Sequence, residues 1–223
     1  MAAESGITRL VKSSSLRERV EKAIGAAIIS GEMAPGELFS APALAARFDV
    51  SATPVREAML NLEKRGLVTA VRNKGFRVTE IDSGSLERLA GVRQLLEPAA
   101  LALLAPQFTI QMAAAARVHA AQIVAGAVNE DLAAYLEADR TFHLLLLGYL
   151  DNPYLVEIVA DLRERTRLGG LKSLLHTDRL EASAHEHHEI VDLLEAHDAD
   201  GVRRLMHRHI GHVTGWWSGA DEG

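Results

Sequence analysis

Beyond residue 82, apolar side chains recur at intervals of three and four residues, and no segment alternates polar with apolar residues. This spacing is typical of α-helices with one buried face, whereas a half-buried strand requires alternation. The pattern predicts six helices, at residues 83–105, 110–127, 130–149, 153–174, 180–196 and 199–217. Because such helices bury their apolar faces against one another, we expect an antiparallel all-α bundle.

The first 80 residues follow a different plan. Helical patterns cover residues 16–29, a short stretch after Ser40, and a stretch from about Thr53 to Arg65. Two strand-like stretches joined by a polar turn follow them. Three helices and a two-stranded hairpin form a winged helix-turn-helix, whose third helix enters the DNA major groove. The predicted fold class is therefore mainly α, an N-terminal winged helix-turn-helix plus a C-terminal antiparallel all-α helical bundle.

The distribution of charge separates the same two parts. Residues 1–80 carry 12 Lys and Arg against 9 Asp and Glu, and the remaining residues carry 12 against 21. The basic first part suits DNA phosphates and the acidic second part suits another partner. The predicted organisation is a flexible tail (1–15), a winged helix-turn-helix domain (16–80), a linker (81–85), an all-α domain (86–217) whose binding role is considered below, and a C-terminal tail (218–223).

Two absences from the sequence exclude several classes of protein. The chain contains no cysteine, which excludes a disulfide scaffold, thiolate zinc sites and cysteine nucleophiles, and which suits a reducing cytoplasm. No stretch of about 18 apolar residues is present, and the first residues do not resemble a signal peptide. We therefore expect a cytoplasmic location and no membrane partner.

The third helix of the first part carries the candidate DNA contacts. Its outward positions are polar, namely Ser51, Thr53, Arg56, Asn61 and Lys64. The turn of the hairpin adds positive charge where phosphates would lie, through Arg72, Asn73 and Lys74. The alternative is a winged module that contacts protein, or a solvated basic face. The clustering of charge on one edge favours double-stranded DNA.

Residues 35–68 resemble the DNA-binding domain of GntR-family transcription regulators. The Pro35-Gly36 turn, the block from Val50 to Ala58, the segment from Glu63 to Val68, and Gly75 carry the resemblance. It implies that Ser51, Thr53 and Arg56 contact phosphates or bases and that Gly75 lies at the tip of the wing. The family usually has arginine where Ala52 stands. Alanine cannot make arginine's bidentate contact with guanine, so the family's operator sequence does not carry over.

Helical periodicity also shows which polar residues fall on buried stripes. Asp139 and His143 lie one turn apart on the apolar face of their helix, and His187 and His209 lie on the apolar faces of two others. Each histidine alone is more often a hydrogen-bonded core residue. Four buried polar groups would cost several kcal/mol each, and a shared divalent cation removes most of that cost. Three imidazoles and a carboxylate favour Zn²⁺, with Ni²⁺ or Mn²⁺ as alternatives. His212 lies near the same face and competes with His209.

This part of the chain resembles the FCD domain, the ligand-sensing domain of the FadR subfamily of GntR regulators. Matching segments lie at residues 92–98, 139–143, 152–153, 186–191 and 206–210. In many members of that family the aspartate and three histidines at these places bind a metal, and a small carboxylate metabolite often completes the coordination shell. The resemblance therefore implies a metal site and a small organic-acid effector.

Two arginines of the second part fall on inward stripes. A buried arginine needs an anionic partner, and a bidentate carboxylate fits its guanidinium. We therefore expect Arg93 and Arg165 to bind the effector. The alternative is an internal or dimer-interface ion pair, for example between Arg93 and Glu97. Arg163 and Arg167 are expected on a solvated face.

Together these expectations describe a transcription regulator rather than an enzyme. It would repress from a double-stranded operator as a homodimer, and effector binding in the bundle would shift helix packing near the linker. One alternative is a metal-responsive regulator with no organic effector. Another is a metal-dependent enzyme fused to a DNA-binding module, against which no separate general base stands out, since Glu186 and Glu189 are expected to point away from the core.

Overall fold

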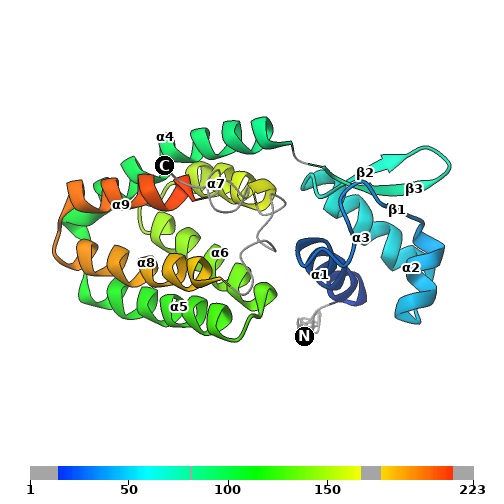
Figure 1. Ribbon diagram of the computed structural model, residues 1–223, viewed down its shortest axis with the longest axis horizontal. Coiled ribbons are helices and arrows are strands. Elements are labelled where there is room, and N and C mark those ends of the chain that lie inside the picture. Colours follow the sequence, from blue (N-terminus) through cyan, green and yellow to red (C-terminus); the bar gives the residue numbers. More distant parts are fainter. Residues whose placement is uncertain (1–14, 81, 167–176, 213–223) are drawn as a thin grey trace, which may run out of the picture.

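The computed structural model describes residues 15–80, 82–166 and 177–212. Most of the two predicted tails, Ile81, Arg167 and residues 213–217 of the last predicted helix lie outside this part of the chain. Within it, a smaller winged part and a larger helical bundle lie end to end (Figure 1). Each part has its own hydrophobic core, so each buries its own apolar residues.

The winged part consists of three helices and a small sheet. Its elements are α1 (Leu16–Ile29), β1 (Leu38–Phe39), α2 (Ala41–Phe48), α3 (Ala52–Lys64), β2 (Val68–Val71) and β3 (Gly75–Val78). The sheet is antiparallel in the order β1-β3-β2 and therefore has three strands, not the two that were predicted. Two residues are too few to show alternation, so β1 leaves no signal in the sequence.

Local interactions set where the first helices begin and end. Ser15 and Glu18 form a reciprocal capping box at the start of α1. The Ser40 side chain caps α2 by accepting a hydrogen bond from the backbone N–H of Ala43, and Asp49 ends α2 in the left-handed conformation (φ 52°). The corner between α2 and α3 is therefore defined by short-range chemistry, which presents the start of α3 to solvent.

The bundle contains the six helices that the periodicity predicts. They are α4 (Ser83–Leu104), α5 (Ile110–Val128), α6 (Leu132–Gly148), α7 (Pro153–Thr166), α8 (Asp178–Glu195) and α9 (Ala199–Gly211), with the short 3₁₀ helix η1 (Ala105–Gln107) after α4. The side chains of Thr109 and Asp198 cap the starts of α5 and α9. Asn129 ends α5, and it is Asp131 that caps α6, which corrects the predicted start at residue 130.

The arrangement of the bundle places polar residues of five helices in one interior. Helix α4 packs against α7 and α9, α5 packs against α6 and α8, and α8 packs against α9 (Figure 1). Polar residues of α4, α6, α7, α8 and α9 are buried among the apolar side chains of this core. No helix of the described residues is long and apolar enough to cross a membrane.

Candidate functional site

Four ligand-type side chains converge inside the bundle from three helices. Helix α6 supplies Asp139 and His143, α8 supplies His187, and α9 supplies His209. All four are buried, and one ligand atom from each lies within 4.8 Å of the others. The convergence that the helical periodicity predicts is therefore present in the fold. His212, also buried, lies outside this set and bonds to Glu186 instead.

Three of the distances between the ligand atoms match the size of a transition-metal site. The Nε2 atoms of His143 and His187 are 3.2 Å apart. The Oδ1 atom of Asp139 lies 3.2 Å from Nε2 of His187 and 3.6 Å from Nε2 of His143. A tetrahedral site with bonds of about 2.0 to 2.1 Å separates its ligand atoms by about 3.3 Å.

The far sides of two imidazole rings are held by hydrogen bonds. Nδ1 of His187 lies 3.0 Å from the carbonyl oxygen of Ala184, and Nδ1 of His209 lies 2.8 Å from Oε2 of Glu186. Each acceptor places the ring proton on Nδ1 and leaves the lone pair of Nε2 directed at the common point. Such outer partners orient histidine ligands in metal sites and raise their basicity.

The contact between His187 and Asp139 bears on whether the four side chains can hold a cation. A neutral His187 that donates from Nδ1 to Ala184 presents its Nε2 lone pair, at 3.2 Å, to the carboxylate oxygen of Asp139. Two acceptors at this distance repel each other unless a proton or a metal cation lies between them. The residues therefore fit a divalent metal ion held by Asp139, His143, His187 and His209.

The protonation states of the site also suit a metal. Burial, together with the positive charge of Arg163, holds the pKa of His143 well below its ordinary value. Burial lowers the pKa of His209 to about 4, although its bond to Glu186 opposes the shift. Burial would raise the pKa of Asp139, but the positive charge of Arg163 holds that pKa well below its ordinary value. At neutral pH these two imidazoles are neutral and the carboxylate is charged, as metal ligation requires.

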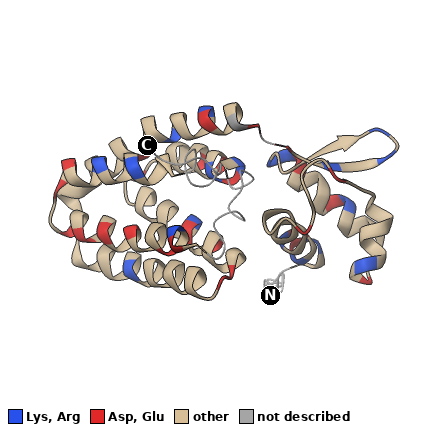
Figure 2. Cartoon of the chain, viewed as in Figure 1, with Lys and Arg blue, Asp and Glu red and all other residues tan. Residues whose placement is uncertain are grey.

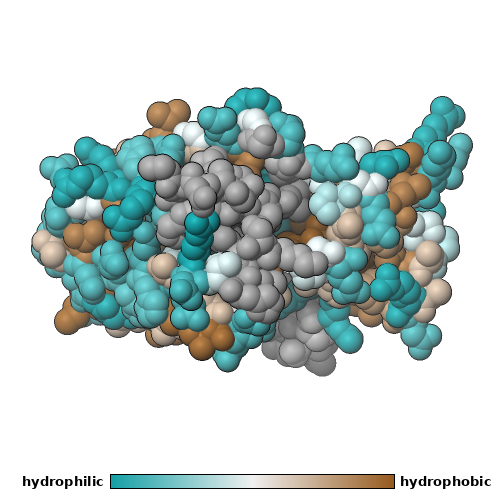
Figure 3. Space-filling model, in the orientation of Figure 1, coloured by the Kyte–Doolittle hydropathy of each residue, from teal (hydrophilic) through white to brown (hydrophobic). Residues whose placement is uncertain are grey.

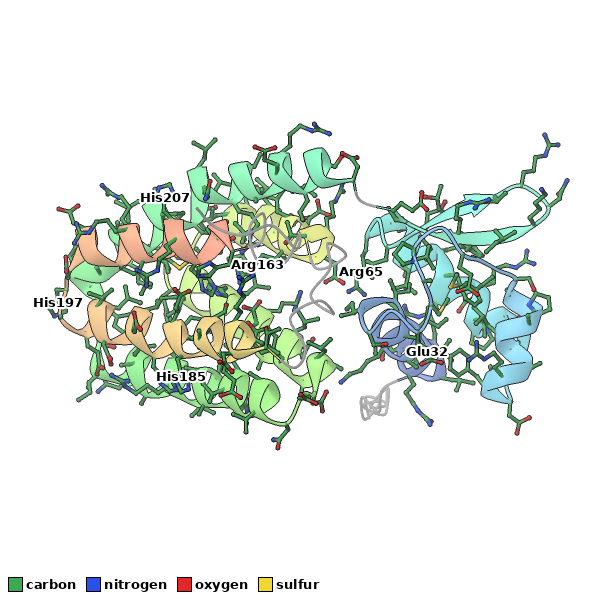
Figure 4. The ribbon with its side chains drawn as sticks, viewed as in Figure 1. Glu32, Arg65, Arg163, His185, His197 and His207 are labelled. Carbon is green, nitrogen blue, oxygen red and sulfur yellow. The ribbon has the colours of Figure 1, made fainter. Side chains whose placement is uncertain are left out.

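Arg163 lies beside this site. Its Nη1 is 2.8 Å from Oε2 of Glu97, and its Nη2 is 3.1 Å from Oδ2 of Asp139 (Figure 4). The prediction that Arg163 lies on a solvated face is therefore wrong. The apolar residues Leu155 and Leu162 suggested the wrong phase for α7, because both are only partly buried, whereas Val159, Arg163 and Thr166 form its buried line.

The two arginines predicted to bind the effector are placed differently. Arg93 is buried, but it donates to Oε1 of Glu97 at 2.7 Å and to Thr166 at 3.2 Å, which is the internal pair weighed as the alternative. Arg165 does not face the interior. Its side chain is 44% exposed and pairs with Asp161 on its own helix, which corrects the prediction that it lines the effector site.

Glu186 is a residue of the candidate site that the sequence did not reveal. It was expected to point away from the core, yet it is buried and accepts hydrogen bonds from His209 and His212. Burial would raise the pKa of Glu186, but these two bonds lower it. Arg208 also donates to it at 3.0 Å. Glu186 precedes His187 on α8, and it is brought into the site because α9 packs against this part of α8.

Three buried polar atoms near the site make no hydrogen bond of standard geometry within the described part of the chain, although two of them, the Tyr135 and Ser183 hydroxyls, lie close enough to each other for Ser183 to lower the pKa of Tyr135 against the effect of burial. They are the Tyr135 hydroxyl, the Ser183 hydroxyl and Nε of Arg163. Tyr135 precedes Asp139 by one turn of α6, and Ser183 precedes His187 by one turn of α8. Buried polar groups without a good hydrogen bond are costly, so these atoms are candidates for contact with a polar ligand.

The predicted DNA contacts lie on the winged part. Ser51, Thr53, Arg56 and Lys74 are exposed, and the Ser51 hydroxyl makes no capping bond to α3. Figure 2 shows basic residues in the turn of the wing. Asn61 differs, because its side chain donates to Glu21 at 3.0 Å.

Gly75 has a structural role in the wing. Its φ is +131°, and a Cβ atom at this position would lie 2.2 Å from the carbonyl oxygen of Phe39. The glycine therefore allows β3 to approach β1 closely. Any contact of Gly75 with DNA would be additional to this requirement.

Comparison with known proteins identifies a matching family for the winged part and another for the bundle. The family described as "Bacterial regulatory proteins, gntR family" matches residues 16–78, and the family described as "FCD domain" matches residues 88–212. The "HTH-type transcriptional repressor RspR" of Escherichia coli is 24% identical over 93% of this chain and 91% of its own length. The "Nta operon transcriptional regulator" of Aminobacter aminovorans is 29% identical over 82% of this chain and 85% of its own.

Solved structures show the same fold. "E. coli McbR/YncC" superposes with a TM-score of 0.74 at 25% identity, covering 90% of this chain and 95% of that one. A "putative transcriptional regulator GntR" from Rhodococcus sp. RHA1 superposes with a TM-score of 0.73 at 24% identity, covering 92% of this chain and 99% of that one. Both the order of the two parts and the helical architecture of the second are therefore shared.

Proposed function

This chain belongs to the gntR family of bacterial regulatory proteins and is a transcriptional regulator with an FCD domain, and from that premise we propose how it is controlled. It represses transcription as a homodimer, and a small carboxylate metabolite bound beside a metal ion in the bundle modulates its affinity for operator DNA. Zn²⁺ fits the donor set best, with Ni²⁺ or Mn²⁺ as alternatives. The observation that carries the proposal is the convergence of Asp139, His143, His187 and His209 on one point.

A metal ion held by Asp139, His143, His187 and His209 would supply a positively charged centre for an effector carboxylate. Arg163 adds a second positive charge, and its Nε has no hydrogen-bond partner among the described residues. The hydroxyls of Tyr135 and Ser183 supply neutral donors near the same centre. A charged carboxylate with a further polar group suits this combination, because buried charges require paired charges and buried hydroxyls require partners.

The last turn of α7 links the site to the winged part. Arg163 holds Asp139, and the next residue, Glu164, accepts a hydrogen bond of 2.5 Å from Arg65. Arg65 is the C-cap residue of α3, the helix expected to enter the major groove, and it also pairs with Glu21 of α1 at 3.0 Å. Figure 4 shows Arg65 on the side of the winged part that faces the bundle.

Effector binding therefore acts on DNA affinity through two consecutive residues. A ligand that draws the Arg163 guanidinium toward itself also moves the backbone that carries Glu164. The pair between Glu164 and Arg65 then shifts or breaks, which changes the orientation of α3 relative to the bundle. Because the coupling is reciprocal, operator DNA changes effector affinity by the same factor.

The test is a titration of operator binding. Operator fragments are selected from genomic DNA with the purified protein, and their affinity is then measured against a panel of di- and tricarboxylates before and after treatment with a chelator. We expect one carboxylate to change DNA affinity several-fold only in the metal-loaded protein. A response to the chelator alone would favour a metal-responsive regulator without an organic effector, and turnover of a carboxylate would favour an enzyme.

Matched variants locate the effector. Tyr135→Phe and Ser183→Ala each remove one hydroxyl without adding bulk, so both should weaken the response to the carboxylate while metal content stays unchanged. Thr141→Ala on α6 is the control, because its hydroxyl donates to the carbonyl oxygen of Glu137 on its own helix. Equal responses in all three variants would place the effector elsewhere.

A further inference from the structure

A second cavity lies at the junction of the winged part and the bundle, and it shares no residue with the metal site. Its volume is about 420 Å³, and pockets that hold small molecules measure about 300 to 1,000 Å³. Figure 3 shows hydrophilic side chains at the start of α4 and on the facing side of the winged part. We call it the junction cavity, and its lining includes Gly66, Thr79 and Glu80 of the winged part and Arg88, Leu89 and Arg165 of the bundle.

Arg165 brings free hydrogen-bond donors to this cavity. Its Nε pairs with Asp161 at 3.0 Å, and neither of its Nη atoms bonds to another residue in the described part of the chain. The two Nη groups form a planar fork that matches the paired oxygens of a carboxylate or a phosphate. Helical phase predicted Arg165 in an effector site of the interior, and the residue lines this separate cavity instead.

Arg88 adds a second positive charge near the start of α4. Its Nη2 donates to Oγ of Ser85 at 2.9 Å, which leaves Nη1 and Nε without a bond to any residue that the structure describes. Glu80 is the one acidic residue in the described lining, and its carboxylate lies against Gly36 in the turn before β1. Two guanidinium groups and one carboxylate leave the cavity with a net positive charge, which favours an anionic ligand.

The side chain of Thr79 adds a hydroxyl that lacks a partner. This hydroxyl is buried and makes no hydrogen bond of standard geometry to any described residue, and the other three side-chain atoms in that state lie near the metal site. Buried polar groups are normally hydrogen-bonded, so the hydroxyl is a candidate donor to a bound ligand. Leu89 and Val92, one turn apart on α4, give the cavity an apolar wall.

We propose that the junction cavity binds a small molecule that carries one carboxylate or phosphate group on a short apolar body. Arg165 and Arg88 hold the anionic group, and Leu89 and Val92 contact the apolar body. The Thr79 hydroxyl donates a hydrogen bond to one oxygen of the ligand. This site goes beyond the proposed function, because it needs no metal ion and none of its lining residues is a metal ligand.

A ligand in this cavity contacts the winged part and the bundle at the same time. Gly66 follows Arg65 and Arg165 follows Glu164, so the cavity lies beside the ion pair that joins the two parts. The backbone of Gly66, at φ 78°, passes so near Arg165 that a Cβ atom would lie 3.8 Å from its Nε. A bound anion that draws Arg165 toward itself acts on the same turn of α7 as Glu164, and it therefore changes the orientation of the winged part.

Calorimetry with two defined anions tests the site. Phenyl phosphate and benzoate each place one anionic group on an apolar ring, and both are titrated into the full chain, metal-loaded and after treatment with a chelator. We expect at least one of them to bind the metal-free protein, with one molecule per chain and a Kd below about 1 mM. Binding of benzoate assigns a carboxylate as the ligand, and binding of phenyl phosphate assigns a phosphate ester. Binding of neither, or binding to the metal-loaded protein alone, would overturn the proposal.

Matched arginine variants locate the bound anion. Arg165→Gln removes the charged fork and should weaken binding about ten-fold, because charge-assisted hydrogen bonds are the strong ones. Arg165→Lys keeps the charge without the fork, so its affinity should lie between those of Arg165→Gln and the wild type. Arg204→Gln, at an exposed arginine of α9, is the control and should bind as the wild type does. Equal affinities of Arg165→Gln and the wild type, or an equal loss in Arg204→Gln, would overturn the proposal.

Thr79→Val tests the hydroxyl, because it replaces that group by a methyl group of similar size. Without ligand, the Tm of this variant should equal or exceed that of the wild type, since a buried hydroxyl without a partner does not stabilise the fold. Its affinity for the anion should be several-fold lower. A lower Tm with unchanged binding would overturn the assignment of the Thr79 hydroxyl to the ligand.

Operator binding separates this cavity from the metal site. The anion that binds should change the operator affinity of the wild type several-fold, with or without chelator, and the same concentration should have a smaller effect on Arg165→Gln. Metal content should be the same in Arg165→Gln and the wild type. An effect that the chelator abolishes would place the anion at the metal site, and unchanged operator affinity with the anion bound would overturn the link to the winged part.

Discussion

Arg163→Met tests how charge is balanced around the site. Arg163 is 3% exposed and pairs with two buried carboxylates, those of Glu97 and Asp139. Breaking a buried pair by removing one partner costs about 3 to 5 kcal/mol. Glu97 keeps its bond to Arg93 at 2.7 Å, so Asp139 is the carboxylate that mainly loses its partner. The cost in unfolding free energy should therefore lie near the lower end of this range. In the metal-free variant we expect the free energy of unfolding to fall by about 3 kcal/mol, which corresponds to a decrease of about 6 to 12 °C in Tm.

The metal-loaded Arg163→Met variant should lose less unfolding free energy than the metal-free variant. A cation bound at Asp139 replaces the charge of Arg163, so that the remaining loss is about 1 kcal/mol, the value of one hydrogen bond. The difference of about 2 kcal/mol implies that the variant binds metal about 30-fold more tightly than the wild type. Coulomb's law also predicts tighter metal binding by the variant, because the variant lacks a positive charge beside the cation.

The assay is urea denaturation in chelator and in saturating Zn²⁺, combined with a competition titration of metal affinity. Arg165→Met is the matched control, because Arg165 lies two residues away on the same helix and is half exposed. That variant should change the free energy of unfolding by no more than about 0.5 kcal/mol in either condition. Equal losses for Arg163→Met with and without metal, or weaker metal binding, would refute the reasoning.

Three other predictions concern the winged part and its link to the bundle. Arg56→Ala should weaken operator binding while metal content stays unchanged, which fluorescence anisotropy and metal analysis check together; unchanged affinity would remove Arg56 from the interface. Glu164→Gln should reduce the effector-induced change in operator affinity about five-fold, equivalent to about 1 kcal/mol; an undiminished effect in the same titration would exclude the contact with Arg65 as the link. Gly75→Ala should lower the Tm of the winged part, because its Cβ would collide with the backbone of Phe39; a Tm equal to that of the wild type in calorimetry would contradict this.

The sequence predicts the helices and the converging ligands because both depend on helical phase. Asp139 and His143 lie one turn apart within the long buried stripe of α6, and His187 and His209 lie on equally clear stripes. In α7 the phase is ambiguous. Only Val159 anchors its buried apolar line, so the wrong arginine was expected inside, two residues from the correct one.

Other features depend on contacts between elements, which periodicity within one helix does not contain. Glu186 is buried because α9 brings His209 and His212 against it. The link between Arg65 and Glu164 joins residues 99 positions apart, and no local sequence pattern predicts it. Strand β1 is created by its pairing with β3 rather than by its own two residues.

Metal analysis of two histidine variants tests the central claim most directly. His187 and His185 lie two residues apart on α8, the first buried in the ligand set and the second exposed on the outer face (Figure 4). The account predicts one metal ion per chain in the wild type and in His185→Ala, and an affinity at least about 100-fold lower in His187→Ala. Equal metal content and affinity in all three proteins would contradict it.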